Sequence, residues 1–116
     1  MPRILIVEDE PLIAMTVADM LEELGYEIAG TVARLDEALA FVEQHAIDGA
    51  LLDVNLGRDK IDPVADLLAR KQCPFIFATG DGKAGLPAGH EARPFVSKPF
   101  RLQDLERAMA RAVAPK

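Results

Sequence analysis

Short apolar runs and helical repeats alternate along this chain. Five of the runs predict strands, at residues 3–7, 26–32, 49–53, 75–78 and 94–97. The first run, which includes Ile4 and Val7, is continuously apolar, as in a strand that is buried on both faces of a parallel sheet. The third run has the same buried character and ends at Asp53. The pattern therefore predicts a sheet with at least two central, fully covered strands.

Between these runs, apolar residues recur at spacings of three and four, which predicts amphipathic helices. One helix begins at Pro11, which suits a first helical turn, and ends before Gly25. A second helix covers residues 35–42, and the last covers residues 102–113. Strands that alternate with helices of this length imply a parallel sheet with helices on both faces, because each crossover must return the chain over the sheet.

The third and fourth crossovers differ in composition. Asp62 is predicted to cap the third helix, with Pro63 at its first helical position. Residues 80–93 hold four glycines and one proline, a composition that disfavours a full helix. The fourth helix is therefore expected to be short or mobile.

Polar residues stand at the ends of four predicted strands. They are Glu8 and Asp9 after the first strand, Asp53 at the end of the third, Thr79 after the fourth and Lys98 after the fifth. In sheets of this type, functional groups gather beyond the carboxyl ends of the strands. These five side chains are therefore expected to meet at one edge of the sheet.

The chemistry of this group suggests a cation site beside a phosphoryl acceptor. Three carboxylates in one pocket repel one another unless a cation is present, and Mg²⁺, with Mn²⁺ as a substitute, is the natural ion for such oxygen ligands. Lys98 supplies an ammonium group and Thr79 a hydroxyl, the two donors needed to hold a phosphoryl group that moves onto Asp53.

Four sequence blocks resemble the signature blocks of response-regulator receiver domains, such as the chemotaxis receivers. They are Ile6-Val7-Glu8-Asp9-Glu10, Leu51-Leu52-Asp53, Ala78-Thr79-Gly80 and Ser97-Lys98-Pro99-Phe100, and their order and spacing match the family across the whole chain. The resemblance implies an α/β, flavodoxin-like (βα)5 fold, which is a doubly wound five-stranded parallel sheet in the order 2-1-3-4-5.

The resemblance also implies a ligand set for the metal. Asp9 and Asp53 are the implied direct ligands of Mg²⁺, Glu8 is an indirect one, and Asn55 contributes its main-chain carbonyl. Asp53 is the implied phosphoacceptor, which takes its phosphoryl group from a phosphohistidine and later loses it to water. The phosphohistidine belongs to a sensor histidine kinase or a histidine phosphotransfer protein, which docks near the first helix.

Three further residues receive signalling roles from the same resemblance. Thr79 and Lys98 sense the phosphoryl group, and Phe95 stands where many receivers place an aromatic ring that turns inward after the threonine has shifted. The signal then passes to a downstream protein through contacts of the receiver itself, over a face built by residues 80–93, the fifth strand and the last helix.

A narrower resemblance rests on Pro74-Phe75-Ile76-Phe77-Ala78-Thr79-Gly80. It is similar to a receiver subgroup, known mainly from alphaproteobacteria, that has Phe-Ala-Thr-Gly at the threonine and is unusual around the fourth helix. Proteins of this subgroup are often single domains. The chain departs from the wider family at Glu8, where aspartate is commoner, at Gly57, where proline is frequent, and at Arg101, where a capping hydroxyl is usual. These departures bear on rates and on helix entry.

Composition narrows the possibilities. The chain has 116 residues, half of them apolar, which suits one receiver domain over residues 1–116 with no output domain. Its net charge of -6 disfavours binding to the negatively charged backbone of nucleic acids. No apolar run approaches the length of a membrane span, no signal peptide is present, and the lone Cys73 cannot form an internal disulfide. We therefore expect a cytoplasmic protein, monomeric or weakly dimeric, without membrane contact.

Simpler interpretations exist for each residue taken alone. Acids after a strand are common as solvated helix-entry or capping groups, which covers both Glu8 and Asp53. An aromatic such as Phe95 more often serves packing than movement. His45 and His90 have no convergent partner in the sequence and receive no role. The isomer of the Lys98–Pro99 bond is left open.

Three other functions compete with a phosphorylated receiver. A small phosphohydrolase with an aspartate nucleophile usually needs an acid two residues later, and Asn55 stands there instead. An interaction module that works without phosphorylation would be supported by loss of Asp53, Thr79 or Lys98, and all three are present. The chain could also be one receiver cut from a hybrid kinase or a longer regulator, an alternative that the natural Met1 disfavours.

Overall fold

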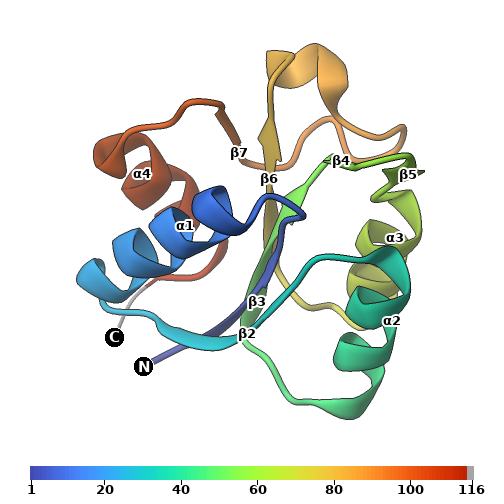
Figure 1. Cartoon of the computed structure of the whole chain (residues 1–116), viewed down its shortest axis with the longest axis horizontal. Coiled ribbons are helices and arrows are strands. Elements are labelled where there is room, and N and C mark those ends of the chain that lie inside the picture. Colours follow the sequence, from blue (N-terminus) through green and yellow to red (C-terminus); the bar gives the residue numbers. More distant parts are fainter. Residues whose placement is uncertain (115–116) are drawn as a thin grey trace.

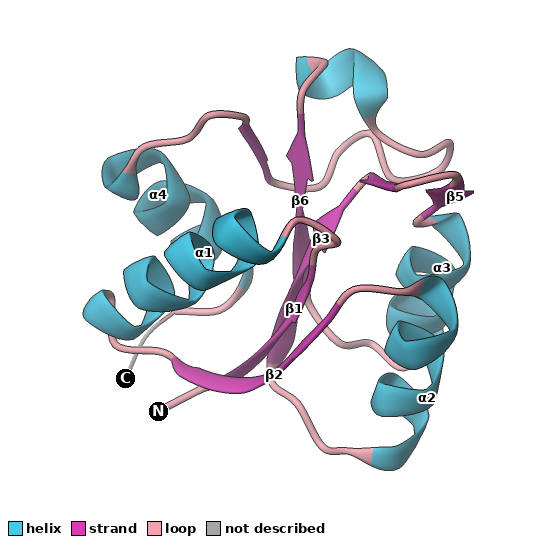
Figure 2. Cartoon of the chain, in the orientation of Figure 1, coloured by secondary structure: helices cyan, strands magenta, loops and turns pink. Residues whose placement is uncertain are grey.

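A parallel sheet of five strands runs through the centre of the protein (Figures 1 and 2). The computed structural model describes residues 1–114. In spatial order the strands are β2 (Glu27–Val32), β1 (Arg3–Val7), β3 (Gly49–Asp53), β6 (Phe75–Thr79) and β7 (Phe95–Ser97). Every neighbouring pair is parallel. The predicted order 2-1-3-4-5 of the five main strands is confirmed.

Two pairs of helices cover the two faces of the sheet. In Figure 1, α1 and α4 lie on one side of the strands, and α2 and α3 lie on the other. The four helices are α1 (Pro11–Glu23), α2 (Leu35–Gln44), α3 (Asp62–Arg70) and α4 (Leu102–Ala112). No helix in residues 1–114 is long and apolar enough to cross a membrane.

The alternation of side chains along the central strands divides the core into two layers. Ile4 and Ile6 pack toward α1 and α4, whereas Leu5 and Val7 pack toward α2 and α3. All four side chains are completely buried, as are the apolar residues of β3. This double covering explains why the first and third runs are apolar at every position rather than at every second one.

The glycine-rich segment forms a single 3₁₀ turn, η1 (Gly82–Gly85), in place of a fourth full helix. In Figure 1 this segment projects beyond the carboxyl end of β6. Two of its glycines, Gly82 and Gly89, have positive φ, a conformation that would interrupt an α-helix. The expected shortness of the fourth helix is confirmed.

The sequence patterns missed a small antiparallel hairpin directly after β3. Its strands, β4 (Asn55–Leu56) and β5 (Asp59–Lys60), have two residues each, too few for apolar periodicity to detect. Gly57 occupies the turn with a φ of 59°. A glycine between the short segments Asn55-Leu56 and Asp59-Lys60 is the signal that could have revealed the hairpin.

The predicted cap of the third helix was wrong by one residue. Ile61 holds the N-cap position without a side-chain hydrogen bond, and Asp62 is already helical. The hairpin decides this start, because the Ile61 N–H donates to the Val54 carbonyl at 3.3 Å while the Ile61 carbonyl accepts from Val64 at 2.9 Å. Ile61 is fully buried, so core packing fixes the residue from which the helix begins.

Candidate functional site

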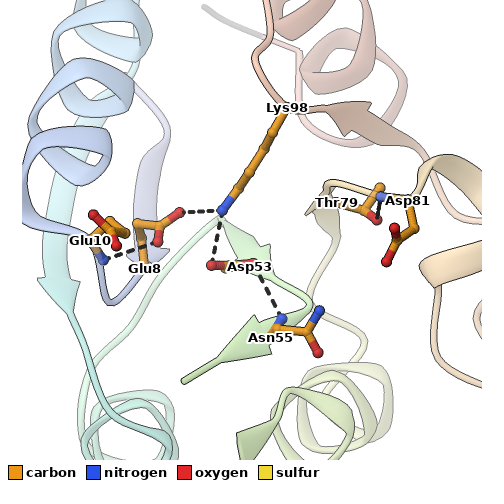
Figure 3. Close-up of polar contacts among 7 residues, drawn as sticks. All are labelled: Glu8, Glu10, Asp53, Asn55, Thr79, Asp81 and Lys98. Atoms are coloured by element: carbon orange, nitrogen blue, oxygen red, sulfur yellow. Dashed lines mark hydrogen bonds and ion pairs between the residues drawn. The ribbon is translucent and has the colours of Figure 1, made fainter. Parts of the chain in front are cut away.

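Parallel strands bring the predicted polar residues to one edge of the sheet. Asp53 is the last residue of β3 and pairs in register with Ala78, and Thr79 of β6 pairs in register with Ser97 of β7. Glu8, Asp9 and Lys98 lie in the loops directly after β1 and β7. Because these parallel strands are held side by side by apolar residues on both faces, their carboxyl ends bring Glu8, Asp53 and Lys98 together (Figure 3).

Three carboxylates form a tight cluster at this edge. Glu8, Asp9 and Asp53 each offer one oxygen, and these oxygens lie within 4.8 Å of one another. Glu8 and Asp53 are buried, and Asp9 is partly exposed. A set of convergent hard oxygen ligands with one open side fits Mg²⁺, which keeps several waters and takes one or two carboxylates directly.

Lys98 reaches across the cluster and joins two of its acids. The ammonium nitrogen Nζ lies 3.0 Å from Oε1 of Glu8 and 3.0 Å from Oδ2 of Asp53 (Figure 3). Burial alone would lower the pKa of Lys98, but the hydrogen bonds to Glu8 and Asp53 and the negative charges of these two acids together raise it. The lysine therefore stays charged and neutralises part of the acidic cluster.

Glu8 is held on both of its oxygens. Oε1 accepts from Lys98, and Oε2 accepts from the backbone N–H of Glu10 at 3.1 Å. Desolvation by burial raises the pKa of Glu8 to about 7, despite the opposing effect of these two hydrogen bonds.

The loop after β7 places Lys98 with the help of the backbone. The Lys98 N–H donates to the Thr79 carbonyl at 2.8 Å, which continues the pairing of β6 with β7 beyond Ser97. The peptide bond between Lys98 and Pro99 is cis, which answers the question that the sequence left open.

Thr79 lies at the same edge but its hydroxyl takes part in a different contact. The hydroxyl oxygen Oγ1 accepts from the backbone N–H of Asp81 at 3.0 Å. Figure 3 draws Thr79 beside Asp81, apart from the pair formed by Asp53 and Lys98. Within residues 1–114, Thr79 makes no side-chain hydrogen bond to either of those two residues. The structure brings Thr79 to the site with its hydroxyl turned into its own loop.

In the described part of the chain, neither Asn55 nor Phe95 makes a side-chain hydrogen bond to the site. The Asn55 N–H donates to Oδ1 of Asp53 at 3.2 Å, and its side chain is exposed at the start of the hairpin. The turn of the hairpin lies close to the acidic cluster, since a Cβ at Gly57 would be 3.8 Å from Oδ2 of Asp9. Phe95 is partly buried and packs against the core layer beneath α2 and α3.

A buried polar group outside the predicted site was missed in the sequence. His90 is 7% exposed; its Nε2 lies 2.8 Å from Oδ1 of Asp66, and its Nδ1 accepts from Nε of Arg93 at 3.0 Å. Because the guanidinium can only donate, Nε2 carries the proton that His90 donates to Asp66. Arg93 also stacks over the Phe75 ring, 4.1 Å from its centroid. Asp66 lies 24 residues away in the sequence, on α3, so no local sequence motif predicts this contact.

Comparison with known families shows which family this fold belongs to. The family model described as "Response regulator receiver domain" matches residues 4–110. The chain belongs to this family. It is thus a receiver domain of two-component signal transduction, a phosphoacceptor signalling module of a kind that partners with histidine kinases, and its cluster of Glu8, Asp9 and Asp53 is typical of the Mg²⁺ site of receivers.

Solved structures of other receivers resemble this one closely. The solution structure of SdrG from Sphingomonas melonis Fr1 is 47% identical, with a TM-score of 0.84 over 95% of this chain and 94% of that chain. The BeF3-activated conformation of SdrG from Pseudomonas melonis Fr1 is 46% identical, with a TM-score of 0.79 over 93% of this chain and 92% of that chain. The protein is therefore close to SdrG-type receivers.

Among curated proteins, the transcriptional regulatory protein PdtaR of Mycobacterium tuberculosis is 36% identical over 97% of this chain. The match covers 57% of PdtaR, and the chain spans about half the length of the curated relatives that it matches. The shared part is the receiver.

Proposed function

We propose that this receiver accepts a phosphoryl group on Asp53 from a phosphohistidine of a sensor histidine kinase or a histidine phosphotransfer protein. The observation that carries the proposal is the contact of Lys98 with the Asp53 carboxylate at 3.0 Å, beside a cluster of carboxylates that suits Mg²⁺. A buried acid with an adjacent cation and a metal-binding neighbourhood has the elements that phosphoryl transfer requires. The BeF3-activated form of SdrG supports the assignment by similarity.

The transfer forms one bond and breaks another. A carboxylate oxygen of Asp53 attacks phosphorus, the P–N bond to the histidine breaks, and the imidazole leaves with the bonding electron pair. Asp9 and Asp53 are the proposed direct ligands of Mg²⁺, with Glu8 as an indirect one and the Asn55 main-chain carbonyl as a further ligand. When bound, the ion supplies charge neutralisation for the phosphoryl oxygens. Lys98, now bound to Asp53, would turn its ammonium to a phosphoryl oxygen, and Thr79 would supply a hydroxyl.

The first helix carries the surface that we assign to the phosphodonor. Leu12 and Met15 of α1 are 76% and 63% exposed, which is unusual for large apolar side chains. Leu12 also lines a depression of about 370 Å³ that ends at Lys98 and is mostly apolar, formed by Leu12, Ile13, Thr16, Val17, Met20, Lys98, Pro99 and Phe100. A histidine-bearing helix of the donor that lies here would have its phosphohistidine next to the site.

Intact mass measurement after incubation with Mg²⁺ and acetyl phosphate tests the proposal. The wild type is expected to gain one phosphoryl group, and Asp53→Asn is expected to gain none while its circular dichroism stays native. Asp59→Asn, an exposed substitution of the same kind in the neighbouring hairpin, should label like the wild type. Labelling of Asp53→Asn would contradict the site. Failure of the wild type with both acetyl phosphate and a histidine kinase would instead favour an interaction module that works without phosphorylation.

A further inference from the structure

The resting position of Thr79 depends on more than its own hydrogen bond. The side chain is completely buried, and its hydroxyl accepts from the Asp81 N–H at 3.0 Å. The hydroxyl also lies against η1, whose last residue is Gly85. A Cβ at position 85 would lie 2.5 Å from Oγ1 of Thr79 and 3.2 Å from Cβ of Asp81. The hydroxyl therefore occupies the space that any side chain at position 85 would need.

The backbone does not explain the glycine at this position. Gly82 and Gly89 of the same segment have positive φ, a conformation that favours glycine, but Gly85 is not among the residues with positive φ. Alanine would therefore fit the local conformation of residue 85. The main obstacle is the contact with the Thr79 hydroxyl, since real Cβ atoms do not approach other atoms to 2.5 Å, and the 3.2 Å approach to Cβ of Asp81 is a smaller one.

The geometry of threonine limits how such a clash can be relieved. Its Cβ carries a hydroxyl, a methyl group and a hydrogen, which exchange places among three staggered rotamers. One rotation would direct the methyl group at position 85, where it would collide as the hydroxyl does. The other directs the hydrogen there and removes the contact with Oγ1, so that only the smaller overlap with Cβ of Asp81, at 3.2 Å, remains to be relieved by a slight shift. A side chain at position 85 thus selects the one rotamer in which the hydroxyl has left Asp81.

We propose that Gly85 is a positioning residue for Thr79. Because Gly85 has no side chain, the Thr79 hydroxyl can occupy the space beside it and stay hydrogen-bonded to Asp81 in the unphosphorylated protein. The inference rests on the proposed function, in which Thr79 turns to the phosphoryl group. Departure of the hydroxyl removes the packing of η1 on Thr79, so the position of Thr79 and the position of the glycine-rich segment are coupled through this contact.

The substitution Gly85→Ala tests the proposal, and Gly80→Ala is its matched control. Gly80 belongs to the same segment and lacks positive φ, and among residues 1–114 no atom would lie within 4 Å of a Cβ at this position. In NMR spectra of the unphosphorylated protein, Gly85→Ala should move the Asp81 amide and the Thr79 methyl signals toward their positions in wild type with Mg²⁺ and beryllofluoride. It should also reach half-maximal response at a several-fold lower beryllofluoride concentration, because part of the rearrangement is already made. Gly80→Ala should do neither.

A second measurement does not depend on phosphorylation. In urea denaturation, Gly85→Ala should lower the midpoint in the wild type and should lower it much less in a Thr79→Ala background, where Oγ1 is absent and only the milder contact with Asp81 remains. Equal effects in both backgrounds, or unchanged Asp81 and Thr79 signals in Gly85→Ala, would overturn the proposal. If wild type fails to respond to beryllofluoride while the two backgrounds differ as expected, the positioning role stands and the phosphoacceptor assignment fails.

Discussion

At the residue scale, one lysine serves two buried acids. Lys98 Nζ lies at hydrogen-bond distance from both Glu8 and Asp53, and in residues 1–114 no buried side-chain nitrogen or oxygen lacks a partner. The cluster is therefore neutralised in part before any metal arrives. Because Lys98 and a divalent cation would lie against the same acids, each can compensate for loss of the other.

Lys98→Ala should reveal this compensation. Without the ammonium, Glu8 and Asp53 remain buried without their cationic partner, and the metal-free protein should lose about 3 kcal/mol of its free energy of unfolding. Mg²⁺ should restore most of that loss. Urea denaturation with chelator and with excess Mg²⁺ measures both effects, and acetyl phosphate should still label the variant in part while its conformational response weakens.

The matched control is Lys83→Ala, which removes the same charge from an exposed position. It should change stability little in either condition. A loss in Lys98→Ala that Mg²⁺ does not reduce would show that the lysine acts through packing rather than through charge.

At the element scale, the connection between β6 and β7 has one end near the site and one end fixed to the core. Its first part contacts Thr79 through Gly85, and its last part is held by His90, which contacts Asp66 of α3 and packs edge-on against Phe75 and Phe77. A segment with one 3₁₀ turn and four glycines has little intrinsic order. The His90 contacts therefore account for how its far end keeps a defined position.

His90→Ala should loosen this segment more than the rest of the protein. It removes a buried ring and leaves Arg93 without its hydrogen-bond partner, so a loss of about 2 kcal/mol is expected. Hydrogen exchange should show faster exchange of amides in residues 82–93 than the global loss explains. His45→Ala, at an exposed histidine that stacks on Phe41, is the control. Uniform acceleration across the molecule would contradict the anchoring role.

The sequence predicted strands and helices well where apolar periodicity was long enough to read. It failed at the two-residue strands after Asp53 and at the start of the third helix, because the hairpin and the burial of Ile61 decide both. The meeting of the three acids with Lys98 at one edge was also predictable, since strand ends of a parallel sheet converge there. The direction of the Thr79 hydroxyl could not be predicted, because it depends on a side-chain rotamer that no sequence pattern records. The partners of His90 could not be predicted either, because they depend on packing between residues that are distant in the sequence.

At the scale of the whole molecule, the site lies between two surfaces with different character. The exposed apolar residues Leu12 and Met15 lie on α1, while the glycine-rich segment lies beyond the carboxyl end of β6 (Figure 1). If the phosphodonor binds the first surface and a downstream partner binds the second, the two proteins do not compete for one face of the receiver. Small phosphodonors need no such surface, which provides a way to separate docking from chemistry.

Leu12→Glu should therefore impair phosphorylation by a histidine kinase but not by acetyl phosphate. Leu12 is 76% exposed, so the substitution should cost little stability, yet it places a charge in an apolar contact that a partner helix would bury. The initial rate of phosphoryl transfer from a phosphorylated kinase should fall at least about tenfold, since one desolvated charge exceeds about 1.4 kcal/mol. Ala40→Glu, at an exposed position of α2 on the opposite side of the sheet, adds the same charge and should leave both rates unchanged. Equal loss with kinase and with acetyl phosphate would mean that Leu12 supports the site itself, and no loss with either would place the donor on another face.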